Sequence, residues 1–223
     1  MKLQYLGDSK DSFKWDYHDY LTNALGFELL NILLMMTPDD STNEGNTRAD
    51  GFPARNEIIQ FCSQLRAQRV LSIIKTLPSK TGGSYQVNLH KSEMHITKNN
   101  RKSFFSEISN RANQVVFLDP DNGLEPETRF NEKHVRYSEI STILGQISTD
   151  SVVSVFQHFR RIRFTDDFAR IKERLLAVIP SAHVTAVFWN QLMFVLISMS
   201  ERTIGKVRQF NIKYSEMYPV KII

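Results

Sequence analysis

Apolar and polar positions follow two patterns along this chain of 223 residues. Three runs, at residues 29–36, 115–118 and 152–156, are apolar and lack the alternation of a half-exposed strand. Continuous apolar runs of this length are typical of strands that helices cover on both faces. We therefore expect these runs to be neighbouring, parallel, central strands of a three-layer α/β fold.

Most other apolar positions recur at helical spacing between these strands. They predict helices at residues 11–25, 56–67, 101–112, 137–147, 165–178 and 201–217. Short strands are predicted at residues 70–77 and 85–90, and a hairpin through Asn190-Gln191 joins residues 183–189 to 193–198. The predicted architecture is a single domain over residues 1–223, with a mostly parallel sheet and a C-terminal antiparallel hairpin.

Residues 38–55 form a long polar stretch that interrupts this pattern. A loop of that length within a compact domain is usually functional or mobile. Residues 42–53 contain two glycines, two asparagines and few apolar anchors, so little burial offsets the entropy of ordering them. We expect this segment to be mobile without ligand and ordered with it, as a lid would be.

Composition narrows the class of protein. Hydrophobic residues make up 41% of the chain, enough for a full core. A count of 28 Lys and Arg against 24 Asp and Glu permits a nucleic-acid partner without requiring one. Cys62 is the single cysteine, which excludes an intramolecular disulfide and fits a reducing cytoplasm. We expect Cys62 to be a buried thiol and the protein to be cytoplasmic, because the chain shows neither a signal-peptide core nor an apolar run of membrane-spanning length.

The most informative segment is Asp119-Pro120-Asp121-Asn122-Gly123, directly after the second apolar run. In open α/β sheets, ligands bind at the carboxyl ends of the strands. The third run ends in Gln157-His158, and sequential strands are usually adjacent. We therefore expect Asp119, Asp121 and His158 to form one functional cluster. The alternative is an acidic surface turn with a structural histidine.

The roles within this cluster stay open. His158 is a candidate to orient a carboxylate, to act as a base near neutral pH or to ligate a metal. Two close carboxylates raise each other's pKa unless a cation intervenes, and Lys14, His158 or a metal is a candidate for that cation.

Substrate contacts are predicted for Asn122 and Gln157 and for the basic residues Arg160, Arg161 and Arg163. The arginines suit phosphate contacts, and a solvated basic turn is the alternative. Nearby aromatic residues offer faces on which a base could stack, or belong to the core; they are Trp15, Phe52, Phe159 and Phe164.

Two further segments are candidates for a cofactor site. Asp11 is predicted to cap the first helix, and Lys14, one turn further, could hold a carboxylate or phosphate. Thr37-Pro38-Asp39-Asp40-Ser41 follows the first central strand, where doubly wound folds hold a nucleotide or adenosyl group. The Gly-x-Gly-x-x-Gly fingerprint is missing there, which weighs against a dinucleotide dehydrogenase.

With these segments in order, the chain resembles a family of uncharacterised bacterial proteins. The family pattern runs G-D-x-x-D-F-x-K-Y, P-D-E-x-x-N, F-x-D-P-D-N-G-x-E and Y-Q-H. The chain matches it at Gly7-Asp8, Asp11-Ser12-Phe13-Lys14-Trp15, Pro38-Asp39-Asp40, Phe117 to Glu125 and Phe156-Gln157-His158, over roughly residues 5–160. Trp15, Asp40 and Phe156 are conservative departures.

That family is distantly similar to Rossmann-fold adenine-N6 methyltransferases of ribosomal RNA. The resemblance implies a Rossmann-like fold and an S-adenosylmethionine-dependent methyltransferase acting on nucleic acid. It implies a cofactor site made by Asp11, Lys14, Thr37, Pro38, Asp39 and Ser41, with Asp119 facing the target amine. Asp121-Asn122 stands where those enzymes have Pro-Tyr, so their base-stacking aromatic residue is not at that position.

Two other functions remain open. In a Mg²⁺-dependent nuclease or phosphoesterase, such as one of phage defence, Asp119, Asp121 and Glu125 would hold the metal, helped by Asp8, Asp11 or His158. The chain lacks a clear nuclease lysine motif. In the third interpretation the fold is a degenerate enzyme that serves as a binding subunit for a protein partner.

Overall fold

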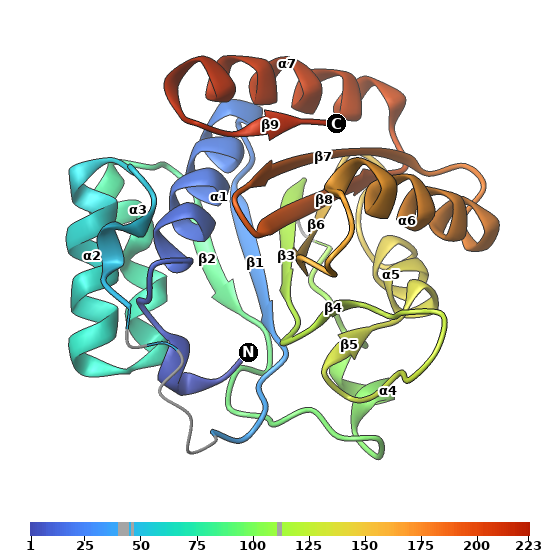
Figure 1. Cartoon of the computed structure of the whole chain (residues 1–223), viewed down its shortest axis with the longest axis horizontal. Coiled ribbons are helices and arrows are strands. Elements are labelled where there is room, and N and C mark those ends of the chain that lie inside the picture. Colours follow the sequence, from blue (N-terminus) through green and yellow to red (C-terminus); the bar gives the residue numbers. More distant parts are fainter. Residues whose placement is uncertain (40–44, 46, 111–112) are drawn as a thin grey trace.

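The computed structural model describes residues 1–39, 45, 47–110 and 113–223, which form a seven-stranded mixed sheet with helices on both faces (Figure 1). The strand order is β2-β1-β3-β6-β8-β7-β9. The strands are β1 (Leu29–Leu34), β2 (Gln86–Leu89), β3 (Gln114–Asp119), β6 (Val152–His158), β7 (His183–Trp189), β8 (Leu192–Ser198) and β9 (Lys221–Ile222).

The three predicted central strands are confirmed as parallel neighbours, because β3 pairs with β1 on one side and with β6 on the other. From β1 the chain crosses to β2 on one side, then returns to β3 on the other side. Strand order therefore reverses between β1 and β3, which makes this point the topological switch point of the sheet. Strand β8 runs antiparallel to both β6 and β7, which confirms the C-terminal hairpin and the Rossmann-like α/β class.

Helices cover the two faces in separate sets. The first set is α1 (Asp11–Leu25), α2 (Asn56–Gln68), α3 (Leu77–Thr81) and α7 (Glu201–Met217), and the second is α4 (Arg101–Phe104), α5 (Tyr137–Leu144) and α6 (Phe164–Val178). Within β3, Val115 and Phe117 belong to the first core, whereas Val116 and Leu118 belong to the second. Both faces of the strand are buried, which explains its uninterrupted apolar run. Cys62 is buried in the first core, as expected.

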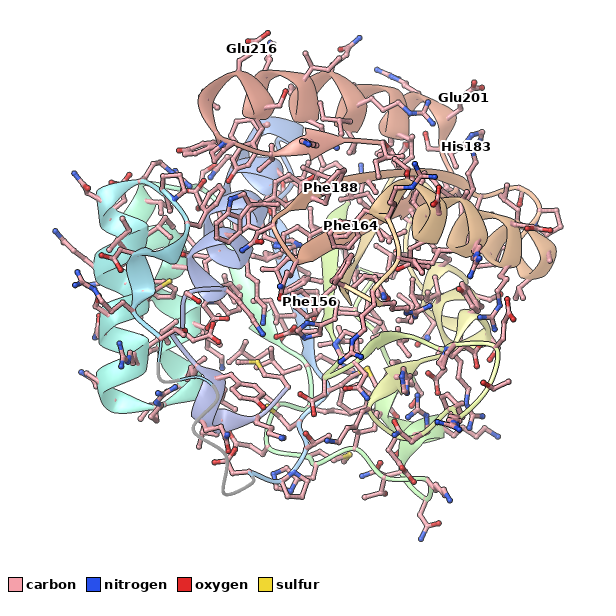
Figure 2. The ribbon with its side chains drawn as sticks, viewed as in Figure 1. Phe156, Phe164, His183, Phe188, Glu201 and Glu216 are labelled. Carbon is pink, nitrogen blue, oxygen red and sulfur yellow. The ribbon has the colours of Figure 1, made fainter. Side chains whose placement is uncertain are left out.

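An aromatic contact joins α6 to the sheet, and α7 carries charged residues on its exposed side. Phe164, at the start of α6, packs on Phe188 of β7 with ring centroids 4.9 Å apart. Figure 2 labels both rings, of which Phe164 is buried and Phe188 half-buried, and it shows the exposed Glu201 and Glu216 on α7. Among the described residues, no helix combines the length and apolar content needed to cross a bilayer.

The prediction of a strand at residues 70–77 is wrong. The segment forms a 3-10 helix, η3 (Leu71–Thr76), which leads directly into α3. Ile74 and Leu77 are the fully buried apolar side chains here, and their spacing of three residues places them on one side of such a helix. Packing of this side against the first core overrides the strand propensity of the β-branched residues.

The predicted helix at residues 101–112 is much shorter than expected. Helix α4 ends at Phe104, and Glu107 adopts a left-handed conformation with φ of 64°. The described part of the following segment is held by side-chain contacts instead, since Gln146 accepts a hydrogen bond from the backbone N–H of Ile108. Residues 111–112 lie outside the described residues.

Short elements complete the edge where the candidate site lies. Strands β4 (Gly123–Leu124) and β5 (His134–Val135) pair with each other, and neither was predicted because two residues show no periodicity. In the long polar segment, η2 (Ala49–Gly51) is a single 3-10 turn. Residues 40–44 and 46 lie outside the described residues, so the expected mobility of residues 42–53 stays a prediction.

Candidate functional site

A polar cavity of about 720 Å³ lies at the carboxyl ends of β3 and β6, beside the N-terminal segment. We call it the Asp119 cavity. Its lining includes three acids, several cations, two histidines and three aromatic rings, namely Asp8, Asp119, Asp121, Lys2, Lys10, Lys14, Lys133, Arg160, His134, His158, Tyr5, Phe156 and Phe159.

Asp119 and Lys14 form a buried ion pair in the wall of this cavity. Lys14 Nζ lies 2.9 Å from Asp119 Oδ2 and 3.3 Å from Asp11 Oδ1. Burial alone would lower the pKa of Lys14, but Asp119, Asp11 and Asp8 outweigh it and raise that pKa. The lysine therefore stays charged and is the cation that the close carboxylates require.

Asp11 does not cap α1 as the sequence predicted. Lys10 occupies the cap position, and Asp8 accepts hydrogen bonds from the backbone N–H groups of Lys10 at 2.8 Å and Asp11 at 3.2 Å. Asp11 itself is fully buried and accepts from the backbone N–H of Gly7 at 2.7 Å. Burial and the nearby charge of Asp8 raise the pKa of Asp11 to about 6, although Lys14 opposes this shift.

Asp121 lines the same cavity and has its own set of partners. Thr37 donates its hydroxyl hydrogen to Asp121 Oδ2 at 3.2 Å, and Lys133 Nζ lies 3.3 Å from that oxygen. Burial alone would raise the pKa of Asp121, but the Met1 amino group and Lys133 outweigh it and lower that pKa. Asp119 and Asp121 thus face one cavity but are balanced by different cations.

His158 borders the cavity at the end of β6, with its ring centroid 4.6 Å from that of Phe156. Burial, followed by the charges of Lys10 and Lys14, lowers the pKa of His158 to about 3. The imidazole is therefore neutral near pH 7. It suits hydrogen bonding, and it holds a transferred proton weakly.

The predicted substrate residues separate into two groups. Asn122 and Arg160 line the cavity, whereas Gln157 is fully buried, where it accepts a hydrogen bond from the backbone N–H of Leu124 at 2.8 Å. Gly123 approaches Gln157 so closely that a Cβ atom there would lie 2.4 Å from its Oε1.

The three arginines do not form one patch. Arg160 donates to the backbone oxygen of Leu124, and Arg161 is exposed with φ of 63°. Arg163 is exposed and pairs with Asp166 at 2.9 Å. Arg160 is therefore the arginine of the three that lines the cavity.

Glu125 is engaged away from the two aspartates. Its Oε1 accepts the backbone N–H of Tyr137 at 2.9 Å, at the start of α5. Among the described residues, no three His, Cys, Asp or Glu side chains are grouped as a metal site would require. The Mg²⁺ set of Asp119, Asp121 and Glu125 is therefore not assembled in this arrangement.

The residues assigned to a cofactor contact the N-terminal segment. Thr37 donates its backbone N–H to the Met1 carbonyl oxygen at 2.8 Å, and Asp39 accepts from the backbone N–H of Gln4 at 3.2 Å. Pro38 is exposed, and Ser41 lies outside the described residues.

Sequence reasoning did not assign Lys10 or Lys133 to the site, although both line the cavity. Neither stands in a motif, and Lys133 is brought to Asp121 by the β4–β5 pair, which has no local signal. Comparisons of the chain with protein-family models, with curated proteins and with solved structures find no match.

Proposed function

We propose that this protein acts on nucleic acid, and that its reaction is the transfer of a methyl group from S-adenosylmethionine to a group held in the Asp119 cavity. The observation that carries the proposal is the position of this cavity. It lies outside the carboxyl ends of β3 and β6, at the sheet edge where open α/β folds bind ligands, and β3 is one of the two strands at the switch point.

The side chains of the cavity support a nucleic-acid substrate. Phe159 lines the cavity and is 43% exposed, so its ring is accessible for a base to stack on. Lys10 and Lys133 line the same space and attract phosphate groups. An accessible aromatic ring beside lysines suits a nucleotide better than an uncharged metabolite. Phe159 thus offers an aromatic ring for a base in a chain that has Asp121-Asn122 after β3, where the methyltransferases have Pro-Tyr.

Asp119 is the residue best placed to meet the group that is modified. Held by Lys14, its carboxylate accepts hydrogen bonds, so it can orient an exocyclic amine or a hydroxyl group of a nucleotide. The neutral imidazole of His158 adds a second hydrogen-bonding group to the same wall.

The proposal of S-adenosylmethionine as cofactor rests on the resemblance to methyltransferases. The side-chain contacts of the expected cofactor residues limit how the cofactor can bind. Lys14 is balanced by Asp119 and Asp11, and Thr37 and Asp39 hold the N-terminal segment. In this arrangement Thr37 and Asp39 contact residues 1–5, so these two residues can meet S-adenosylmethionine only after that segment moves. We therefore expect cofactor binding to displace residues 1–5.

Fluorescence anisotropy with labelled single-stranded RNA and DNA tests the nucleic-acid part. Phe159→Ala should weaken binding about tenfold or more, because stacking on an aromatic ring contributes about 1–3 kcal/mol per base. The control is Ile212→Ala, which truncates a 52% exposed side chain on α7. Equal affinities of the two variants would contradict base binding in the Asp119 cavity.

Isothermal titration with S-adenosylmethionine tests the cofactor part separately. We expect saturable binding, and methylated oligonucleotide detectable by mass spectrometry after incubation with the cofactor. If millimolar ligand gives no heat and no methylated product, methyl transfer is wrong and the nucleic-acid part stands on the anisotropy data alone.

A further inference from the structure

A second cavity, of about 250 Å³, adjoins the Asp119 cavity and shares Arg160 with it. One wall is helix α6, where Arg170 and Arg174 are four residues apart and so share one helical face. Tyr137, the first residue of α5, also lines this space, and we call it the Tyr137 cavity.

The hydroxyl group of Tyr137 is an unsatisfied polar group at this cavity. The residue is 2% exposed, and its hydroxyl group has no hydrogen-bond partner among the described residues. The guanidinium group of Arg174 lies over its ring, 4.7 Å from the centroid. Burial raises the pKa of the phenol to about 12, against the nearby charges of Arg174 and Arg160. Tyr137 is therefore a neutral donor without an acceptor, and native structures leave few such groups unexplained.

The Tyr137 cavity holds more positive than negative charge. Arg160 Nη1 lies 3.6 Å from the buried carboxylate of Asp167, and the charge of Arg170 also acts on that carboxylate, so Asp167 offsets one of the three arginines. Arg174 donates to a backbone carbonyl oxygen at 2.7 Å, which fixes its guanidinium group without neutralising it. Arg170 is exposed and makes no hydrogen bond within the described part of the chain. The remaining acid of the lining, Glu127, is exposed and offsets one of these two arginines.

We propose that the Tyr137 cavity holds a phosphate group of a nucleic-acid strand whose neighbouring nucleotide occupies the Asp119 cavity. Arg170 and Arg174 are the donors that line the cavity, and the Tyr137 hydroxyl group, whose oxygen is enclosed in this arrangement, joins them when the phosphate binds. Guanidinium groups present paired N–H donors that match phosphate oxygens. The identity of the polyanion rests on the proposed function, whereas the phosphate site itself does not.

Two variants test the site in protein without added cofactor. Tyr137→Phe removes a hydroxyl group that has no partner, so Tm should stay the same or rise, while the affinity for a single-stranded oligonucleotide falls about three- to tenfold. Tyr85→Phe is the matched control, because its hydroxyl group donates to Asp19 Oδ1 at 2.6 Å. It should lower Tm and leave the affinity unchanged.

Arg170→Gln should weaken oligonucleotide binding and reduce the slope of log affinity against log salt by about 0.7, the change expected for one lost phosphate contact on a single strand. Lys172→Gln removes a cation that is exposed on the same helix and outside the cavity, and it should leave the slope unchanged.

Inorganic phosphate serves as a second probe and separates this site from the proposed function. We expect phosphate to raise the Tm of the wild type and to raise it less in Tyr137→Phe and Arg170→Gln. A phosphate effect without oligonucleotide binding would keep the site and refute the nucleic-acid function. The proposal is overturned if neither probe binds, or if Tyr137→Phe lowers Tm as Tyr85→Phe does while affinity is unchanged.

Discussion

Helix α1 contributes to two buried clusters of acidic side chains, and they differ in how fully their oxygens are hydrogen-bonded. In one cluster Arg55 lies between Asp16 and Asp19, and in the other Lys14 lies between Asp11 and Asp119. Both contain more carboxylates than cations. In the first the carboxylates are buried and Arg55 is partly exposed, whereas the second borders a cavity.

In the Arg55 cluster every carboxylate oxygen has a donor. Asp16 accepts from Arg55 Nε at 2.8 Å and from the Tyr214 hydroxyl at 2.7 Å. Asp19 accepts from Arg55 Nη2 at 2.7 Å and from the Tyr85 hydroxyl at 2.6 Å. These bonds connect α1 to α7 and to the residues that precede α2 and β2. A fully satisfied network of this kind stabilises the scaffold.

In the Lys14 cluster the hydrogen bonding is incomplete. Lys14 faces Asp8, Asp11 and Asp119, and Lys10 adds its charge at Asp8. Asp11 Oδ1 lies 3.3 Å from Lys14 Nζ but has no hydrogen-bond partner among the described residues. Burial raises the pKa of Asp8 as well as that of Asp11, with Lys14 opposing both shifts. The comparison teaches that burial and charge alone do not mark a site. The informative combination is an incompletely satisfied cluster next to a cavity.

The largest effect should come from breaking the satisfied cluster. Asp16→Asn removes the charge that faces Arg55 and turns one acceptor oxygen into a donor. We expect the free energy of unfolding to fall by about 2 kcal/mol or more, because bonds to charged groups are worth about 1.5–3 kcal/mol each. Urea unfolding measures this. A loss below about 0.5 kcal/mol would show that the network contributes little.

The pH dependence of the free energy of unfolding should show whether His158, beside the Lys14 cluster, is neutral in the folded protein. The pKa of His158 is about 3 in the folded protein, against an ordinary value of 6.5. Burial is the main cause of this lowering. The charges of Lys10, Lys14 and the Met1 amino group lower the pKa further, whereas Asp121 opposes the shift. Between these values the unfolded chain binds the extra proton. The free energy of unfolding should therefore rise with pH in this window, by up to about 1.4 kcal/mol per pH unit.

His158→Asn should lose this part of the pH dependence. Urea unfolding of both proteins at several pH values between about 4 and 7 measures the difference. His18, whose pKa burial also lowers to about 3, is present in both proteins and cancels. Parallel profiles for the two proteins would contradict a neutral, buried His158.

The smallest effect on stability should come from an Asp-to-Asn change in the Lys14 cluster. Asp119→Asn leaves Lys14 beside Asp11 and relieves repulsion among the carboxylates, so the free energy of unfolding should change by less than about 1 kcal/mol. Methyl transfer or oligonucleotide binding should nevertheless be lost. Retained activity with a loss of stability as large as that of Asp16→Asn would assign Asp119 to the scaffold.

The local pattern of the sequence predicted the central sheet well. A strand buried on both faces must be apolar at nearly every position, so β1, β3 and β6 are visible without knowledge of their neighbours. The place of Asp119 followed from the same logic, because the residue after a central strand lies at the carboxyl edge of the sheet. The η3 segment and the short α4 were missed because packing, rather than periodicity, decides their conformation.

By itself the sequence determined the three central strands and the position of Asp119, Asp121 and His158 at one edge. Only the tertiary structure decided their partners. Lys14 meets Asp119 across 105 positions of the chain, and Tyr137 meets Arg174 between α5 and α6. The reason is physical: periodicity reports which face of an element is buried. The charge state and the hydrogen bonding of a side chain instead depend on groups that folding brings beside it from distant parts of the chain.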